Sequence, residues 1–178
     1  EIASCLVGSE MCIRDSVVED PKGEIAPGTL VAWHAAPGSY AEQVAVDRNR
    51  LVAVPEGVAP EVAASMLLQG MTSHYLLHGV RETKPGDTMV VTAGAGGVGL
   101  ILTQMAAAEE ATVYSVVSTD EKEQLAYDAG ATKVFRYGED LAEQIKAENG
   151  GGVDVVYDGV GQLSLIHISE PTRQEAIS

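Results

Sequence analysis

The sequence predicts an α/β fold built on a partial, doubly wound parallel sheet. From residue 89 onward, short apolar runs rich in β-branched residues alternate with helical patterns. Runs of this kind are typical of parallel strands that are buried on both faces. A glycine-rich turn follows the first run, and such strand–helix alternation folds through right-handed crossovers.

The elements of this region follow from local patterns. Asp120 and Glu121 open one helical segment, as the helix dipole favours, and Gly130 suits its end. Strands are expected at Met89–Ala93, Ala111–Val117, Lys133–Arg136 and Val153–Tyr157, with helices at Val98–Ala108, Asp120–Ala129 and Gly138–Ala147.

The preceding region has a different character. Residues 17–55 are rich in proline and glycine and contain three β-like runs, Thr29–His34, Ser39–Val46 and Leu51–Val54. Pro60 then starts a helical pattern over Glu61–Leu77. We therefore expect one domain over residues 17–58 and a second over residues 59–162.

The two ends of the chain stand apart from the rest. Leu6–Ser16 and Leu163–Arg173 can be encoded by opposite strands of one nucleotide stretch, and both resemble a translated sequencing-library adapter. We expect residues 1–16 and 163–178 to be adapter-derived, so that the native segment is an internal fragment. Both cysteines, Cys5 and Cys12, lie in these ends, so no disulfide or cysteine metal site is expected.

The composition limits the classes of partner. Asp plus Glu number 26 against 11 Lys plus Arg, giving a net charge of −15 that disfavours nucleic acid. The sequence contains no run of about 18 apolar residues, so no membrane span is predicted. We expect a cytoplasmic protein that binds neither membranes nor nucleic acid.

The main chemical signal is a glycine-rich turn. Gly94, Gly96 and Gly99 form a G-x-G-x-x-G pattern between an expected strand and an expected helix, with Gly97 and Val98 inside it. The first glycine permits a tight turn, the second a close approach to a pyrophosphate, and the third close helix–strand packing. Amides at the helix start would face the anion. The alternative is a purely structural turn.

The end of the second strand bears on cofactor choice. An NAD site has Asp or Glu about 20 residues beyond the glycines, whereas this chain has Ser118 and Thr119 there, with Lys122 one helical turn on. These residues favour NADPH over NADH. Ser118 and Thr119 also suit a helix cap, and Asp120 and Glu121 would oppose a phosphate if they pointed inward.

The remaining candidate residues are weak. His74 and His78 share a helix face, but no third ligand is evident, so no metal site is expected. No acid/base pair or nucleophile motif appears, and catalytic residues are not identified.

Five strings together resemble the quinone oxidoreductase branch of the zinc-independent medium-chain dehydrogenases/reductases. They are PGSYAEQVAV, MLLQGMTSHYLL, KPGDTMVVTAGAGGVG, VVSTDEKEQLAYDAGA and GVDVVYDGVG, spread from about residue 28 to 161. The resemblance implies that residues 17–58 end a GroES-like catalytic domain and that residues 59–162 are part of a Rossmann domain.

The resemblance also implies site residues. Gln69 and Thr72 would lie near the nicotinamide, and Gly96, Gly97 and Val98 at the pyrophosphate. Ser118 and Lys122 would meet the adenosine 2′-phosphate, with Tyr137 against the adenosine. The family carries no catalytic zinc and is commonly dimeric, so the parent is expected to be a homodimer.

The expected activity of the parent is NADPH-dependent hydride transfer to a quinone. Reduction of an activated C=C bond in an enone, as by enoyl reductases of similar build, is the rival. A non-catalytic nucleotide-binding protein and an inert fragment also stay open as interpretations.

Overall fold

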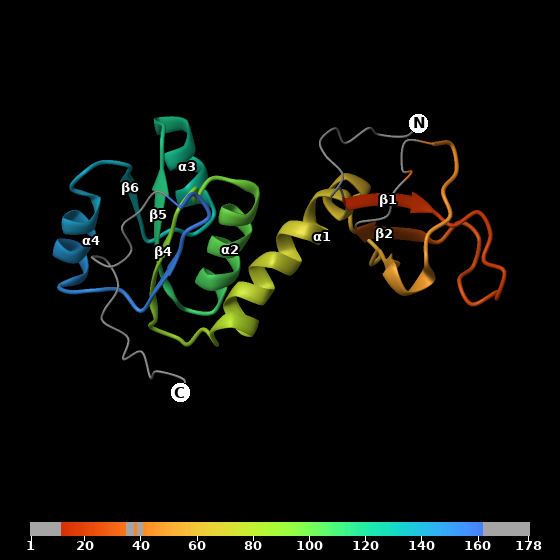
Figure 1. Ribbon diagram of the computed structural model, residues 1–178, viewed down its shortest axis with the longest axis horizontal. Helices are drawn as coiled ribbons and strands as arrows, with labels where there is room; N and C mark the ends of the chain where they lie inside the picture. Colours follow the sequence, from red (N-terminus) through yellow and green to blue (C-terminus); the bar gives the residue numbers. More distant parts are fainter. Residues whose placement is uncertain (1–11, 35–37, 39–40, 162–178) are drawn as a thin grey trace. The chain divides into compact units, whose positions relative to one another are not determined.

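The computed structural model describes residues 12–34, 38 and 41–161, and the chain divides into two compact units, residues 1–71 and 72–178 (Figure 1). Helix α1 (Pro60–His74) begins in the first unit and ends in the second. The domain boundary expected at residue 58 lies earlier in the chain and stays a prediction.

The first unit contains a small antiparallel sheet of β1 (Cys12–Ser16), β2 (Leu30–His34) and β3 (Val52–Ala53). β2 and β3 occur where the sequence predicts strands. β1 pairs with β2 and lies in the segment predicted to be adapter-derived, for which the sequence predicts no element. That origin stays a prediction.

The strand predicted at Ser39–Val46 is wrong over its described part, because residues 41–46 form no strand. Residues 39–40 lie outside the described residues. A β-like sequence forms a strand only when a neighbouring strand pairs with its backbone groups. Here both ladders of β2 are taken by β1 and β3.

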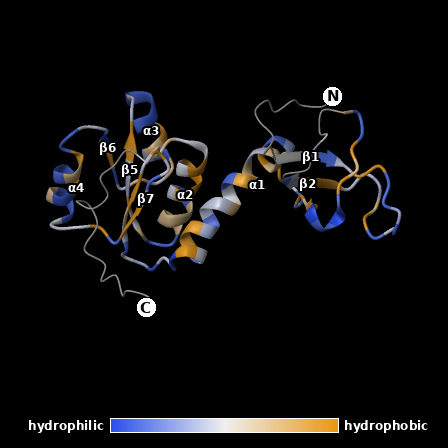
Figure 2. Cartoon of the chain, in the orientation of Figure 1, coloured by the Kyte–Doolittle hydropathy of each residue, from blue (hydrophilic) through white to orange (hydrophobic). Residues whose placement is uncertain are grey.

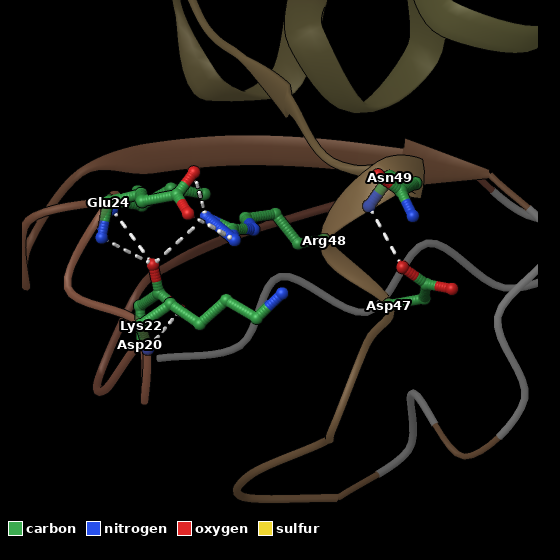
Figure 3. Close-up of polar contacts among 7 residues, drawn as sticks. Asp20, Lys22, Glu24, Asp47, Arg48 and Asn49 are labelled. Carbon is green, nitrogen blue, oxygen red and sulfur yellow. Dashed lines mark hydrogen bonds and ion pairs between the residues drawn. The ribbon is translucent and has the colours of Figure 1, made fainter.

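An acidic side chain organises the loop between β1 and β2 (Figure 3). The Asp20 carboxylate accepts hydrogen bonds from the amides of Lys22, Glu24 and Ile25 at 2.8–3.1 Å. The bond from the Ile25 amide is the largest cause that lowers the pKa of Asp20. Arg48, in the short 3-10 helix Arg48–Arg50, adds ion pairs to Asp20 and Glu24. These contacts fix the loop without a large apolar core.

The second unit is built on a four-stranded sheet of β4 (Thr88–Val91), β5 (Thr112–Val117), β6 (Lys133–Arg136) and β7 (Val155–Tyr157). The spatial order is β6-β5-β4-β7, and all three pairings are parallel. The parallel α/β sheet predicted from the sequence is confirmed. After β4, the chain adds β5 and β6 on one side of it and then β7 on the other side. The strand order therefore reverses between β4 and β7, and ligands bind at the carboxyl ends of the strands at such a switch point.

Helices cover both faces of this sheet (Figure 1). On one face, Met89 and Val91 of β4 pack with Leu102 of α2 (Gly97–Ala108) and with Leu77. On the other, Val90 of β4 packs with residues of α4 (Leu141–Asn149). Side chains on a strand alternate between faces, so consecutive residues of β4 enter two different cores. Figure 2 accordingly shows strongly hydrophobic strands beside largely hydrophilic α3 (Asp120–Asp128) and α4.

Helix α1 continues as a π-helical segment, Tyr75–Val80, so the helix extends past the predicted end at residue 77. Leu77 is fully buried. The hydroxyl of Tyr157, at the end of β7, donates a 3.0 Å hydrogen bond to the Leu76 carbonyl. Burial raises the pKa of Tyr157 above its ordinary value, and the hydroxyl is protonated at neutral pH with or without that shift. The end of the helix is thereby tied to the sheet.

The turn before β4 is closed by an ion pair. The Arg81 guanidinium contacts both carboxylate oxygens of Asp87, at 2.7 and 3.2 Å, and the Lys84 amide donates to the same carboxylate at 2.8 Å. Burial by itself raises the pKa of Asp87, but the hydrogen bonds from Arg81 and Lys84 outweigh it and the pKa is lowered. The carboxylate thus holds the turn in its ionised form.

Candidate functional site

The glycine-rich segment forms the turn between β4 and α2. The Gly94 amide donates to the Val116 carbonyl of β5 at 3.0 Å, and the Gly96 amide donates to the Ala93 carbonyl at 2.7 Å. Ala93 has a φ of +48°, in the left-handed region that side chains other than glycine rarely occupy. The chain therefore reverses direction sharply within a few residues of the strand end.

Two of the glycines are required by close packing. A Cβ on Gly99 would lie 2.4 Å from the Ala93 carbonyl oxygen and 2.9 Å from Gly94 backbone atoms. One on Gly94 would lie 2.7 Å from the Ser115 Cβ. The missing side chains let α2 and β5 approach the turn. This is the close packing that the sequence spacing predicts for these positions.

The start of α2 has the properties of an anion site. Its N-cap is Gly96, which is exposed and supplies no capping side chain, and the first turn carries no acidic residue. The Leu100 amide bonds to the Gly96 carbonyl at 2.9 Å, which leaves the amides of Gly97, Val98 and Gly99 as the first-turn donors. Backbone donors and a positive helix end together suit a pyrophosphate. The turn thus fits the group that the sequence predicts.

The residues expected at the adenosine end gather at the end of β5. The Lys122 Nζ donates to the Ser118 Oγ at 3.2 Å, on the exposed surface. Thr119 is the N-cap of α3, and its hydroxyl accepts a bond from the Lys122 amide. The capping interpretation of Thr119 therefore holds in this structure, while Ser118 and Lys122 lie together with their polar groups exposed.

The acidic residues of α3 are engaged by a cation that the sequence patterns do not single out. Asp120 and Glu123 each contact Nη2 of Arg136, at 2.6 Å. Arg136 is the register partner of Val117 in the parallel sheet, which places it beside the residue preceding Ser118. No local pattern around residue 136 signals this role, because the contact depends on strand pairing.

Tyr137 lies against the glycine turn. Its hydroxyl accepts a 2.7 Å hydrogen bond from the Ala93 amide. This contact holds the residue with left-handed backbone, and it joins the end of β6 to the end of β4. The residue expected at the adenosine thus contacts the turn expected at the pyrophosphate.

Replacing Tyr137 by Phe is expected to loosen the turn, because the Ala93 amide loses its partner. One neutral hydrogen bond contributes about 1 kcal/mol, so we expect a Tm lower by roughly 2–4 °C. A second change, Ala93→Gly, relieves the left-handed backbone and should restore part of the loss. Differential scanning fluorimetry measures both effects, with Tyr127→Phe on exposed α3 as the control. Equal melting of Y137F and wild type would contradict the role.

A polar network fastens the carboxyl ends of β4 and β7 together. The Thr92 hydroxyl donates to the Asp158 Oδ1 at 2.8 Å and accepts from the Gly159 amide at 3.1 Å. The same Asp158 oxygen accepts from the amides of Val160 and Gly161, both at 3.0 Å. We name these two side chains, Thr92 and Asp158, the crevice latch. Sequence reasoning misses it, although the DGVG string that contains Asp158 is part of the resemblance.

The two residues expected near the nicotinamide lie on α1 but in different units. Gln69 belongs to the first unit, and its Oε1 is buried without a hydrogen-bond partner among the described residues. Thr72 is the first residue of the second unit. Next to it, fully buried Ser73 donates to the Val98 carbonyl at 3.3 Å, so this part of α1 contacts the start of α2.

The two histidines of the helix lie close to each other. The rings of His74 and His78 have centroids 4.5 Å apart, and the Nε2 of His78 lies 3.1 Å from a Glu109 carboxylate oxygen. Within the described ranges, no group of three or more His, Cys, Asp or Glu residues has the geometry to hold a metal. In the same part of the chain, no helix is long and apolar enough to cross a membrane.

Comparisons with known proteins agree with this geometry. Residues 97–169 match the family described as zinc-binding dehydrogenase. Quinone oxidoreductase 1 of Escherichia coli is 40% identical over 159 residues, which cover 88% of this chain and 49% of that protein. The sequence of this chain is similar to those of quinone oxidoreductases over most of its length.

Two further similarities point the same way. The E. coli quinone oxidoreductase solved in complex with NADPH superimposes with a TM-score of 0.84 at 34% identity, over 94% of this chain and 54% of that one. A 2-haloacrylate reductase of Burkholderia is 38% identical over 132 residues, 72% of this chain and 40% of that protein. The chain spans about half or less of the length of these relatives.

Proposed function

We propose that this chain is the nucleotide-binding part of an NADPH-dependent quinone oxidoreductase. The observation that carries the proposal is the uncapped start of α2 beside the glycine turn, where side chains are absent at the positions of closest approach. Such a turn at the switch point of a parallel sheet suits a dinucleotide. Its relatives supply the activity: E. coli quinone oxidoreductase 1 and the E. coli enzyme bound to NADPH.

The choice of NADPH rests on the end of β5. Ser118 and Lys122 present a hydroxyl and an ammonium group at the exposed surface, where an NAD site carries an acid. A 2′-phosphate there would meet a cation rather than a carboxylate. We therefore assign this pair to the 2′-phosphate and Tyr137 to the adenosine.

The chemistry of the bound cofactor is hydride transfer, which the protein supports by binding and orientation. The amides of Gly97 and Val98 would hold the pyrophosphate, and the crevice latch would keep the ends of β4 and β7 in register beside it. Gln69 and Thr72 are assigned to the nicotinamide end. We assign no general acid, because a quinone oxygen can take its proton from solvent.

A second activity has support of its own. The 2-haloacrylate reductase, whose name specifies an activated C=C substrate, is 38% identical to this chain. Steady-state assays of the complete parent protein with a quinone and with an enone separate the two. Faster turnover of the enone would favour the alkene reductase. If the chain bound neither NADPH nor NADH, an inert fragment would be favoured.

Further assignments belong to the same proposal. Residues 17–58 would be the end of a GroES-like catalytic domain, and the parent would be a cytoplasmic homodimer acting on a small molecule. Residues 1–16 and 163–178 would be adapter-derived, which recovery of the nucleotide read would test directly.

The proposal predicts selective stabilisation by NADPH. A ligand at 100 times its Kd stabilises the folded state by about 2.7 kcal/mol, so NADPH should raise Tm by roughly 5–10 °C and NADH by less. Lys122→Met should weaken the binding of NADPH about tenfold and leave the binding of NADH unchanged, because only NADPH carries the 2′-phosphate. Lys146→Met, on α4, is the control. A Tm that neither nucleotide raises contradicts the proposal.

A further inference from the structure

Arg136 lies beside the end of β5 and contacts two acidic residues of α3. Its Nη2 lies 2.6 Å from an oxygen of Asp120 and 2.6 Å from an oxygen of Glu123. Both carboxylates belong to α3, the helix that carries Lys122, and Asp120 directly follows its N-cap. One guanidinium thus contacts two carboxylates in the first turn of the helix that carries Lys122.

The charge balance at the first turn of α3 depends on the contact of Arg136 with Asp120 and Glu123. Glu121 is also acidic and exposed, so without Arg136 the opening turn of α3 would present three carboxylates against the single ammonium of Lys122. A 2′-phosphate carries a charge of about −1.5 to −2 at neutral pH. Like charges repel one another over several ångströms, and the Asp120 side chain does so from a fully exposed position and that of Glu123 from a partly exposed one. An unneutralised turn would therefore oppose NADPH and leave NADH almost unaffected.

We propose that Arg136 is a specificity-determining residue that permits 2′-phosphorylated dinucleotides by neutralising Asp120 and Glu123. The inference rests on the proposed function, since it presumes the adenosine end at Ser118 and Lys122. Arg136 acts through the two carboxylates and needs no contact with the nucleotide. The guanidinium is suited to this role because its planar fork offers several N–H donors to the two carboxylates.

The proposal predicts how a set of charge variants binds nucleotide. Arg136→Met should raise the Kd for NADPH about tenfold and change the Kd for NADH less than twofold. Adding Asp120→Asn and Glu123→Gln to Arg136→Met removes the uncovered carboxylates. This triple variant should return the Kd for NADPH to within about threefold of wild type. If the role of Arg136 were only structural, Arg136→Met would raise the Kd values for both nucleotides by similar factors.

The matched control is Lys133→Met. Lys133 lies on the same strand, β6, and pairs with Glu148, so this variant removes one strand cation and one ion pair elsewhere. It should leave the ratio of the two Kd values unchanged. Circular dichroism of each variant checks that the fold is retained.

Equilibrium titration of the full chain with NADPH and with NADH, followed by nicotinamide fluorescence, gives these Kd values. An unchanged NADPH-to-NADH ratio in R136M overturns the inference alone, and so does failure of the triple variant to recover NADPH binding. A wild-type chain that binds neither nucleotide overturns the proposed function together with the inference. The two failures are therefore distinguishable.

Discussion

Replacing Gly99 by Ala is expected to remove nucleotide binding and to destabilise the second unit. The added Cβ would lie 2.4 Å from the Ala93 carbonyl oxygen and 2.9 Å from two backbone atoms of Gly94. All three atoms are backbone, so no flexible side chain can move away. The start of α2 must shift relative to the turn, which displaces the amides of Gly97 and Val98.

The expected size follows from overpacking in a tight site, which costs about 1–3 kcal/mol. At the upper end Tm falls by roughly 6–12 °C, and NADPH no longer raises it. The control is Gly159→Ala, where an added Cβ has no neighbour within 4 Å. If Gly99→Ala melted at the same temperature as Gly159→Ala and NADPH still raised its Tm, the turn would tolerate a side chain. That result would remove the main support for the site.

Breaking the crevice latch is expected to have the next largest effect. In Asp158→Ala, the Thr92 hydroxyl and the amides of Val160 and Gly161 lose a shared acceptor. Hydrogen bonds to a charged group contribute about 1.5–3 kcal/mol, so Tm should fall by roughly 3–12 °C. Because the latch joins the strand ends at the switch point, we also expect the Kd for NADPH to rise at least tenfold.

The chain contains a matched control at the opposite ends of the same strands. The Asp154 carboxylate, just before β7, accepts a 2.8 Å hydrogen bond from the amide of Thr88 at the start of β4. Asp154→Ala should lower Tm while changing the Kd for NADPH less than twofold. Calorimetric titration of both variants with NADPH measures the two Kd values. Equal losses of affinity in the two would mean that the latch acts on stability and not on the crevice.

Much of the second unit can be predicted from local patterns. β6 has the predicted limits, Lys133–Arg136, because a short apolar run there lies between turn residues. The glycine turn is equally local, since its spacing is set by one strand end and one helix start. Helix α4 begins at Leu141 and not at residue 138, because residues 138–140 form a turn in which the Leu141 amide bonds to the Gly138 carbonyl.

The missed contacts have a common physical cause. Arg136 meets the acids of α3 only because β6 pairs with β5, and Thr92 meets Asp158 only because β7 pairs with β4. These residues are 66 positions apart in the second case. Hydrophobic periodicity shows that strands exist but does not give their order, so the partners of these polar groups could not be read from the sequence. The failed strand prediction over residues 41–46 has the same origin.

The parallel pairing of β4 with β7 also constrains how the molecule reaches its native state. Met89 pairs with Val155 across a long intervening stretch, whereas β4–β5 and β5–β6 close much shorter loops. Loop closure over greater chain distances costs more entropy and is slower. We therefore expect the pairing of β4 with β7 to form later in folding than the β4–β5 and β5–β6 pairings.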